Sequence, residues 1–467
     1  MNQVARTFVL VGIVVMALLA LHLLPRLYVG DTELRHVNIL SDLISEVDES
    51  SLNVETITIP EAPTAPVIAS DTVDVNDSMT HTKPVVPQGV TMISDYGQDA
   101  AGGMSHFYQQ LLRVNELGRP VRIAYFGDSF VEGDILTCDL REQLQTLYGG
   151  QGVGWVDCAS QVYGFRPTIG HSFSGIHEYE VVKKPFNTQQ QGIAQRYFVA
   201  EDSVSSSFSY RGVTARKHLA QWQKASLFFR SEGSFSLAMR INNDTTINEQ
   251  VSGSPELQVI TQRHASMNRI SYTVSKTSPH TYLYGVALES PTGVIVDNFS
   301  MRGSSGVTLG SIPLTTLQAF AAQRPYDLLV FHFGLNVASD KSQAGNYKAY
   351  TRQMGEAIRH IRQAYPEASV LIVSMPDRDQ RTSSGIHTMI GVESLVAYQQ
   401  IMAANQQVAF FNLFQAMGGR ESMKQFVDDG LANKDYTHLT FAGGRRLASK
   451  LVESIQTGVD NYKRLHP

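Results

Sequence analysis

The sequence is poor in cysteine and has no excess of basic residues. Its 467 residues include only two cysteines, Cys138 and Cys158, and the formal net charge at pH 7 is −5. The spacing of the cysteines fits no zinc-binding or redox motif. In an exported protein they can form a disulfide, and two unpaired buried thiols are an equally good expectation. Lysine and arginine are scattered and form no basic stripe, so nucleic acid is not an expected partner.

Several motifs that would indicate other chemistry are absent. The 14 histidines include no H-E-x-x-H pair or other clustered ligand spacing, so no metal ion or other cofactor is expected. The glycine-rich stretch GGQGVGW matches neither G-x-G-x-x-G nor a P-loop with its lysine, which argues against a nucleotide cradle. There is no G-x-S-x-G elbow, which argues against the α/β-hydrolase class.

The first 30 residues differ from the ordinary composition of the rest. An apolar run from Phe8 to Leu24 follows Arg6 and precedes Pro25. The run is long enough to span a bilayer, and no A-x-A-like cleavage site follows it. We therefore expect residues 1–30 to form an uncleaved transmembrane helix in the inner membrane, with the body of the protein exported to the periplasm.

Three further segments are predicted after the anchor. Residues 31–100 are acidic and rich in Thr, Pro and Val without a sustained period, which predicts a flexible tether. An α/β domain is expected over residues 101–162 and 297–467. A β-rich module, residues 163–296, is expected to interrupt it. In that module, stretches such as NRISYTVSK and HTYLYGVALES alternate apolar and polar residues, as the half-buried antiparallel strands of a sandwich do.

The α/β domain is predicted from continuous apolar strands that alternate with helical stretches. The strands are VRIAYFG, YDLLVFHFG, ASVLIVSMP and VAFFNLF. Strands of this kind predict a parallel sheet covered by helices on both faces. After the first strand, the sequence predicts an amphipathic helix with a packed face of four leucines, Leu136, Leu140, Leu144 and Leu147.

Functional residues of an open parallel sheet gather outside the carboxyl ends of its strands. Ser129 follows the first strand directly, in Gly-Asp-Ser, and Asn336 follows another strand. Asp435 and His438 are expected in a loop before the last helix. A serine hydroxyl needs a base such as histidine to become a nucleophile, and a carboxylate holds the imidazole in the right tautomer. We therefore expect Ser129 to be the nucleophile, His438 the general base and Asp435 the group that orients it.

Attack on an ester builds negative charge on the carbonyl oxygen, which requires preorganised hydrogen-bond donors. The candidate donors are the Ser129 backbone N–H, the Asn336 side-chain amide and the backbone N–H of a loop glycine. The best candidate for that glycine is Gly303, where the α/β pattern resumes after the β-rich segment.

These blocks resemble the SGNH, or GDSL-type, hydrolases. Gly-Asp-Ser at Ser129, the loop glycine Gly303, G-x-N ending at Asn336 and D-x-x-H ending at His438 occur in the order typical of that family. The resemblance implies a flavodoxin-like three-layer α/β core with a parallel sheet and carboxylic ester hydrolase activity. The β-rich insertion makes the chain most similar to the Gram-negative peptidoglycan O-acetylesterases, whose insertion resembles a carbohydrate-binding module.

That likeness implies an acetylated glycan as partner, with the 6-O-acetyl group of N-acetylmuramic acid in peptidoglycan as the group removed. The sequence departs from relatives at Phe130 and Val337, where they often carry a polar residue. Two alternatives stay open at this point. One is a transferase that moves acetyl groups onto polysaccharide, although such transferases usually carry the Asp/His block ahead of the serine. The other is a non-catalytic glycan-binding protein.

Other conspicuous residues have simpler interpretations. A lone Gly-Asp-Ser is good turn material, so Ser129 depends on the other blocks. His332 lies in a buried strand and is expected to be a core histidine. Trp155 and Trp222 could stack on sugars, but core packing is the stronger expectation. Arg302 could meet an anionic glycan, and a solvated surface position is the simpler reading.

Overall fold

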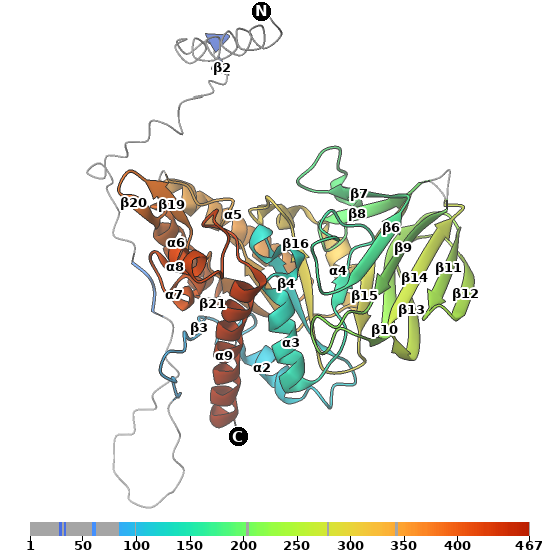
Figure 1. Ribbon diagram of the computed structural model, residues 1–467, viewed down its shortest axis with the longest axis horizontal. Coiled ribbons are helices and arrows are strands. Elements are labelled where there is room, and N and C mark those ends of the chain that lie inside the picture. Colours follow the sequence, from blue (N-terminus) through green and yellow to red (C-terminus); the bar gives the residue numbers. More distant parts are fainter. Residues whose placement is uncertain are drawn as a thin grey trace, which may run out of the picture. The chain divides into compact units, whose positions relative to one another are not determined.

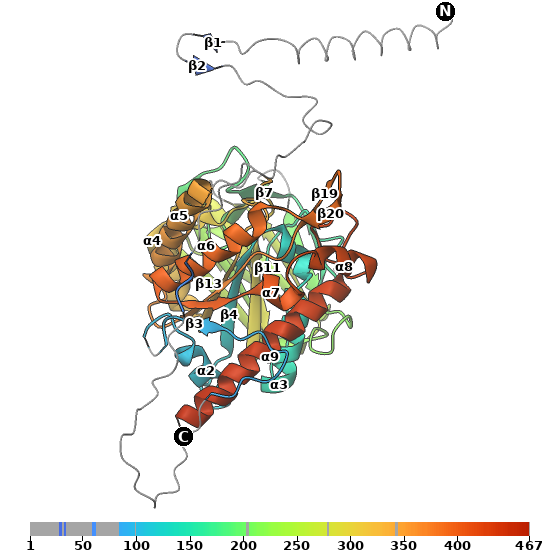
Figure 2. The ribbon, with the colours of Figure 1, turned by 90° about the vertical axis from the view of Figure 1, so that its left-hand side faces the viewer.

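The computed structural model describes residues 58–61, 84–98, 100–201, 205–277, 280–340 and 344–466, together with two short strands near the N-terminus (Figure 1 and Figure 2). Those strands, β1 (Tyr28–Val29) and β2 (Thr32–Glu33), pair antiparallel. The chain divides into two units, residues 1–54 with 382–384 and residues 55–381 with 385–467. The predicted membrane span from Phe8 to Leu24 lies outside the described residues, and no helix within them is long and apolar enough to cross a bilayer.

A parallel sheet forms the centre of the second unit. Its strands lie in the order β16 (Val294–Ser300), β4 (Val121–Gly127), β17 (Leu328–His332), β18 (Ser369–Val373) and β21 (Ala409–Phe411). In chain order this is second, first, third, fourth and fifth, the order of flavodoxin-like sheets. Every residue of β4, β17 and β18 is buried, which confirms the parallel sheet predicted from continuous apolar strands.

Helices cover both faces of this sheet. One group packs around the C-terminal helix, and the other packs around α5 (Figure 2). The first group is α2 (Ser105–Leu112), α3 (Thr137–Tyr148) and α9 (Phe441–Leu465); the second is α4 (Leu314–Gln323), α5 (Ala344–Arg362) and α6 (Gly391–Gln406). Shorter elements follow or connect them: η4 (Val307–Ser311), α7 (Leu413–Met417), α8 (Ser422–Asp428), and the two-stranded sheet of β19 (Asp379–Thr382) and β20 (Gly385–Thr388).

The stretch after Ser129 differs from the continuous helix that the sequence predicted. A short 3-10 helix, η2 (Ser129–Asp134), precedes α3, and Gly133 within it has a left-handed φ of 63°. Asp134 explains the break between η2 and α3, because its buried carboxylate accepts hydrogen bonds from Arg141 and Thr137 of α3. The predicted apolar face of α3 is correct except at Leu147, whose side chain is 53% exposed.

The β-rich segment folds into two antiparallel sheets, as the alternating pattern predicted. One sheet has the order β13 (Ser254–Met267), β10 (Trp222–Ser231), β15 (Thr281–Glu289), β8 (Arg196–Ala200) and β7 (Ile176–Glu180), with β5 (Gly154–Val156) also paired to β15. The other has the order β12 (Thr245–Val251), β11 (Phe235–Ile241), β14 (Arg269–Ser275), β9 (Ser206–Arg211) and β6 (Gly170–Ser174). Apolar side chains of both sheets form one buried cluster that includes Trp222.

The observed limits of this module differ from the predicted limits, residues 163 and 296. The antiparallel pairing already includes β5, and β16 returns to the parallel sheet at Val294. The glycine-rich stretch before β5 contains no alternation, so the sequence offered no signal for a three-residue strand there. The last predicted residues of the module are continuous and apolar because they form β16, a buried parallel strand.

Buried aromatic and ionic contacts join the module to the α/β part. Trp155 of β5 packs between Phe228 of the module and Phe299 of β16, with ring centroids 5.1 and 5.7 Å apart. Glu289 at the end of β15 pairs with Arg122 of β4 and with Arg324, each at 2.8 Å. All three charged side chains are almost fully buried. A buried pair that loses one partner leaves an unpaired charge, so these contacts fix the module to the sheet.

The end of the predicted tether is folded onto the body. In residues 84–98, the Val85 backbone exchanges two hydrogen bonds of 3.0 Å with the Asn461 side chain of α9. The strand β3 (Ser94–Asp95) adds antiparallel to β21, and Tyr96 is buried. A two-residue edge strand has too short a pattern to be found in sequence, so the limit at residue 100 was wrong for this stretch.

Both cysteines are buried and unpaired. Burial and the neighbouring Asp139 together raise the pKa of the Cys138 thiol to about 12. Burial likewise raises the pKa of Cys158. Of the two states expected from the sequence, the structure has the free thiols. Cys158 packs in the apolar cluster of the sandwich, and Cys138 Sγ donates a hydrogen bond to Asp139 Oδ2 at 3.2 Å.

Candidate active site

Ser129 lies at the carboxyl end of β4, where the chain turns sharply out of the sheet. Gly127 ends the strand, and a Cβ atom on it would lie 2.4 Å from Val131 Cγ2 and 3.1 Å from the His332 carbonyl oxygen. Only glycine therefore allows η2 to fold back so closely over the strand end. The turn leaves Ser129 partly exposed as the first residue of η2.

The structure brings together the three side chains predicted to act on a substrate. Ser129 Oγ lies 3.1 Å from His438 Nε2, and His438 Nδ1 lies 2.8 Å from Asp435 Oδ2. Both distances are within hydrogen-bond range, and each imidazole nitrogen has its own partner. The arrangement allows the Asp435 carboxylate to accept the Nδ1 proton, which leaves Nε2 free to accept the serine proton.

The loop before α9 holds this pair by its own backbone. Asp435 Oδ1 accepts hydrogen bonds from the backbone N–H groups of Thr437 and His438, each at 3.0 Å. Burial alone would raise the pKa of Asp435, but these bonds and the His438 side chain lower it below its usual range. Asp435 therefore stays ionised at neutral pH, and its carboxylate can hold the imidazole of His438 in one tautomer. Thr440 then caps α9 by accepting from Gly443 N.

Asp128, the middle residue of Gly-Asp-Ser, has a structural role that we did not predict from the sequence. Its buried carboxylate accepts hydrogen bonds from Phe130 N at 3.0 Å, Gly334 N at 3.3 Å and Leu335 N at 3.2 Å. It thus joins the loop of Ser129 to the loop that carries Asn336. Burial raises the pKa of Asp128 to about 6, and the backbone hydrogen bonds oppose that shift. The position of this carboxylate, directly after a buried strand, was the feature of the sequence that could have indicated its role.

The predicted oxyanion donors lie on loops that are bonded to the serine loop and to each other. Asn336 Nδ2 donates to the Ser304 carbonyl oxygen at 2.9 Å, and Met301 N donates to the Gly127 carbonyl oxygen at 2.9 Å. Gly303, between those two contacts, is exposed with a φ of 75°. These loops follow β16, β4 and β17, which are neighbours in the sheet. One N–H of the Asn336 amide remains for another acceptor, because an amide nitrogen has two.

A buried pair of carboxyl groups supports the His438 loop. Asp377 and Asp379 follow β18, and the Asp379 N–H donates to the Tyr436 carbonyl oxygen at 3.1 Å. Asp377 accepts from Thr388 Oγ1 and Met423 N, each at 2.9 Å. Burial and the neighbouring Asp379 raise the pKa of Asp377, and burial also raises the pKa of Asp379.

This pair makes stability depend on pH in a defined direction. A carboxyl whose folded pKa exceeds its unfolded value keeps a proton that the unfolded chain has released above about pH 4. We therefore expect the free energy of unfolding to fall as the pH rises from 5 to 8. Asp377→Asn should remove much of that fall, as measured by urea unfolding at both pH values, with the exposed Asp428→Asn as control. Parallel pH profiles of wild type and Asp377→Asn would contradict this expectation.

The other residues considered in the sequence analysis lie in the core or on the surface. His332 is buried, with Nδ1 2.9 Å from the Tyr125 hydroxyl, and burial lowers its pKa to about 3. Trp155 and Trp222 are buried core residues, as expected. Arg302 is largely exposed and pairs with Glu132 of η2. Among the described residues, no three His, Cys, Asp or Glu side chains gather as metal ligands.

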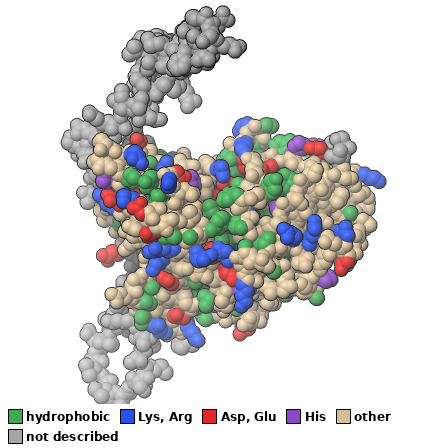
Figure 3. Space-filling model, viewed as in Figure 1, with side chains coloured by type: hydrophobic (Ala, Val, Ile, Leu, Met, Phe, Trp, Pro, Cys, Tyr) green, Lys and Arg blue, Asp and Glu red, His purple; other side chains and the backbone are tan. Residues whose placement is uncertain are grey.

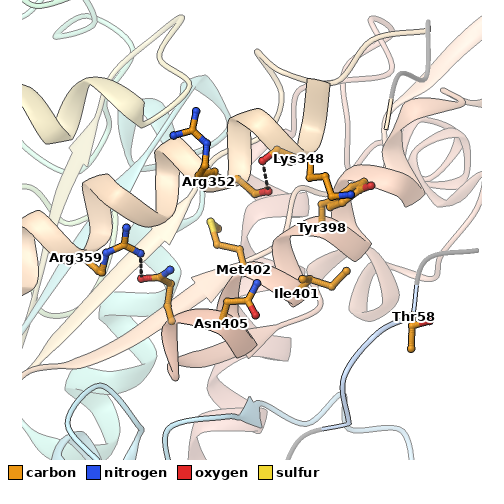
Figure 4. Close-up of a pocket in the computed structure, with 10 residues that line it drawn as sticks. Thr58, Lys348, Arg352, Arg359, Tyr398, Ile401, Met402 and Asn405 are labelled. Carbon is orange, nitrogen blue, oxygen red and sulfur yellow. Dashed lines mark hydrogen bonds between the residues drawn. The ribbon is translucent and has the colours of Figure 1, made fainter. Parts of the chain in front are cut away.

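A groove of about 460 Å³ lies between α5 and α6 (Figure 4). Its rim carries Lys348, Arg352 and Arg359 of α5, and Met402 of α6 lies in its floor. The groove is lined by no serine, histidine or carboxylate, and it shares no residue with the loops of Ser129 and His438. It is therefore not the place where these side chains could react with a substrate.

No model of a protein family matches the chain. No curated protein matches it either. Among solved structures, a peptidoglycan O-acetylesterase superposes with a TM-score of 0.63 at 22% identity, covering 79% of this chain and 99% of that one. The two proteins share a fold. The shared part covers almost the whole of that esterase.

Two more solved structures match shorter parts of the chain with lower scores. One is a family two carbohydrate esterase from Clostridium thermocellum, with a TM-score of 0.26 at 10% identity over 60% of this chain and 98% of that one. The other is a carbohydrate-binding module of family 29, with a TM-score of 0.20 at 9% identity over 29% of this chain and 90% of that one.

Proposed function

We propose that this protein is a serine esterase of the SGNH type that removes O-acetyl groups from a carbohydrate of the cell envelope. The observation that carries the proposal is the hydrogen-bonded series Ser129, His438 and Asp435 at the rim of a flavodoxin-like sheet. Peptidoglycan, acetylated on the 6-hydroxyl of N-acetylmuramic acid, is the substrate we favour. The fold shared with a peptidoglycan O-acetylesterase and the family order of the four motifs support that choice.

The first half of the reaction transfers the acetyl group to the enzyme. Ser129 Oγ attacks the acetyl carbonyl carbon while His438 Nε2 takes the hydroxyl proton, and Asp435 stabilises the imidazolium that results. The carbonyl oxygen becomes an oxyanion held by the Ser129 and Gly303 N–H groups and by the free N–H of Asn336. The C–O bond to the sugar then breaks as His438 returns its proton to the sugar oxygen.

The second half releases acetate and restores the serine. His438 takes a proton from water, and the water oxygen attacks the acetyl carbonyl carbon of the acyl-enzyme. The same three donors hold the second oxyanion. The intermediate collapses to acetate as His438 donates its proton to Ser129 Oγ. No cofactor is needed for either half.

We also propose that the protein works in the periplasm, held at the inner membrane by residues 1–30. The apolar run from Phe8 to Leu24 and the acidic tether after it support this location. The antiparallel sandwich, joined rigidly to the sheet through Trp155 and Glu289, is proposed to bind the glycan chain.

Acetate release from defined glycans tests the proposal. We expect the purified full-length protein to release acetate from O-acetylated peptidoglycan and none from the same material after mild alkaline deacetylation. Release from acetylated xylan alone would overturn the substrate. If radiolabel from an acetyl donor accumulated in polysaccharide and not as free acetate, the protein would be a transferase.

The Asn336 amide gives a prediction specific to the oxyanion site. Asn336→Ala should lower kcat for acetyl ester hydrolysis by about 10²–10³-fold, because one preorganised donor is worth about 2.7–4 kcal/mol. KM should change much less, since the donor acts mainly on charge that forms in the transition state. Steady-state kinetics on a chromogenic acetate ester provide the measurement. A loss confined to KM would mean that Asn336 binds the ground state only.

A further inference from the structure

Two aromatic side chains stand out on the surface of the protein. Among the described residues, Tyr163 and Phe165 are the most exposed of the Phe, Tyr and Trp side chains, at 50% and 44%. They are separated by one glycine in the loop that leads from β5 to β6. Figure 3 shows hydrophobic side chains gathered in the middle of the visible face, over the region where Figure 1 labels β4, β16 and β8. Tyr163 and Phe165 contact the partly exposed rings of Phe173 and Phe441, and exposed apolar side chains that cluster in this way mark binding surfaces.

Phe165 lies beside both halves of the reacting site. Its ring covers Gly133 of η2, the helix that begins at Ser129: a Cβ atom on Gly133 would lie 2.7 Å from Phe165 Cζ. Its ring centroid is also 6.5 Å from that of Phe441, the first residue of α9, which follows the His438 loop. The aromatic surface is therefore continuous with the elements that carry the nucleophile and the base.

The loop is held in place by a buried charge. Arg166, next to Phe165, donates from Nε and Nη2 to Asp134 Oδ2 at 3.0 and 2.9 Å. Burial alone would raise the pKa of Asp134, but the guanidinium groups of Arg141 and Arg166 hold it far below its usual range. On the other side, the Tyr163 ring packs edge-on against Phe173 of β6 at 5.3 Å. A loop fixed in this way loses little conformational entropy when it binds a ligand.

The chemistry of the exposed rings indicates the kind of ligand. A pyranose ring presents C–H groups on one face and hydroxyl groups around its edge. An aromatic ring buries that C–H face while the hydroxyl groups remain in water. We propose that Phe165, assisted by Tyr163, binds a sugar ring of the glycan next to the acetylated residue and so determines the preference for polymeric substrate. This inference rests on the proposed function and deepens it, since the ester itself would react at Ser129.

Comparison of two substrates tests the inference. The measured quantity is kcat/KM for acetylated peptidoglycan strands divided by kcat/KM for p-nitrophenyl acetate, which carries no sugar. We expect Phe165→Ala to lower this ratio about tenfold through a higher KM for the strands, and Phe165→Tyr to restore most of it. Leu147→Ala, which removes an exposed apolar side chain from α3, is the matched control and should leave the ratio at the wild-type value.

An unchanged ratio in Phe165→Ala would overturn the inference. If the unchanged ratio arose from equal losses on both substrates, Phe165 would act by supporting η2. Failure of the proposed function is a separate result, in which the wild-type protein releases no acetate from the strands. In that case cosedimentation with insoluble peptidoglycan still tests the contact between Phe165 and the sugar. Weaker binding by Phe165→Ala than by wild type supports the contact, and equal binding contradicts it.

Discussion

Replacing Ser129 with alanine is expected to lower kcat for acetyl ester hydrolysis by about four to six orders of magnitude. The reason is that the substitution removes the atom that forms the acyl-enzyme, and no other nucleophile stands within hydrogen-bond distance of His438 Nε2 among the described residues. The fold should be retained, because the hydroxyl contacts His438 and lies on a partly exposed turn. Acetate release and a thermal unfolding curve measure the two effects separately.

A serine far from the rim serves as the control. Ser236 on β11 donates a hydrogen bond of 2.9 Å to Gln250 on the neighbouring strand, and Ser236→Ala should keep wild-type activity. If Ser129→Ala kept more than about a hundredth of the wild-type rate, covalent catalysis by Ser129 would be excluded.

Replacing Asp435 with asparagine should lower kcat by about three to four orders of magnitude while leaving KM near its original value. An amide can present its N–H₂ group to His438 Nδ1, which favours the tautomer with the proton on Nε2, and that tautomer cannot accept the serine proton. The backbone bonds from Thr437 and His438 to Oδ1 can persist with asparagine, so the loop should keep its shape. Steady-state kinetics near neutral pH give the measurement.

Asp428→Asn is the matched control for this substitution. Asp428 lies on α8, is about half exposed and, among the described residues, pairs with Lys424 alone, so its amide variant should behave as wild type. The pKa of Asp435 lies below its usual range, so its own protonation should not set the acid limit of activity near neutral pH. An Asp435→Asn variant with wild-type kcat would show that His438 needs no orienting carboxylate.

The parts of the fold that could be predicted are those with long, one-sided patterns. The fully buried strand Val121–Gly127 and the alternating strand Arg269–Ser275 each carry a pattern set by burial alone. The elements that were missed are short or depend on distant partners. The strand Gly154–Val156 has three residues, and the kink at Gly133 exists because Asp134 binds Arg141 inside the core. Neither leaves a local trace in the sequence.

The site divides in the same way. The close approach of Ser129, His438 and Asp435 could be predicted because their residue types, their order and their positions after strands or before a helix are visible in the sequence. The contacts of the groups that support them could not be found. Asp128 is visible as a carboxylate directly after a buried strand, but its partners are backbone N–H groups of another loop. Asp377 lies beside Asp379, whose N–H donates to the His438 loop. Contacts of this kind arise only when the chain has folded.

The most direct test of covalent catalysis at Ser129 is to trap the acyl-enzyme. The full-length protein is mixed with O-acetylated peptidoglycan strands, quenched in acid within milliseconds, digested and examined by mass spectrometry. One acetyl group should appear on the peptide that contains Ser129, and it should disappear as free acetate accumulates. Acetate released at the full rate with no acetyl group on that peptide, or with the group on another residue, would contradict the proposed mechanism.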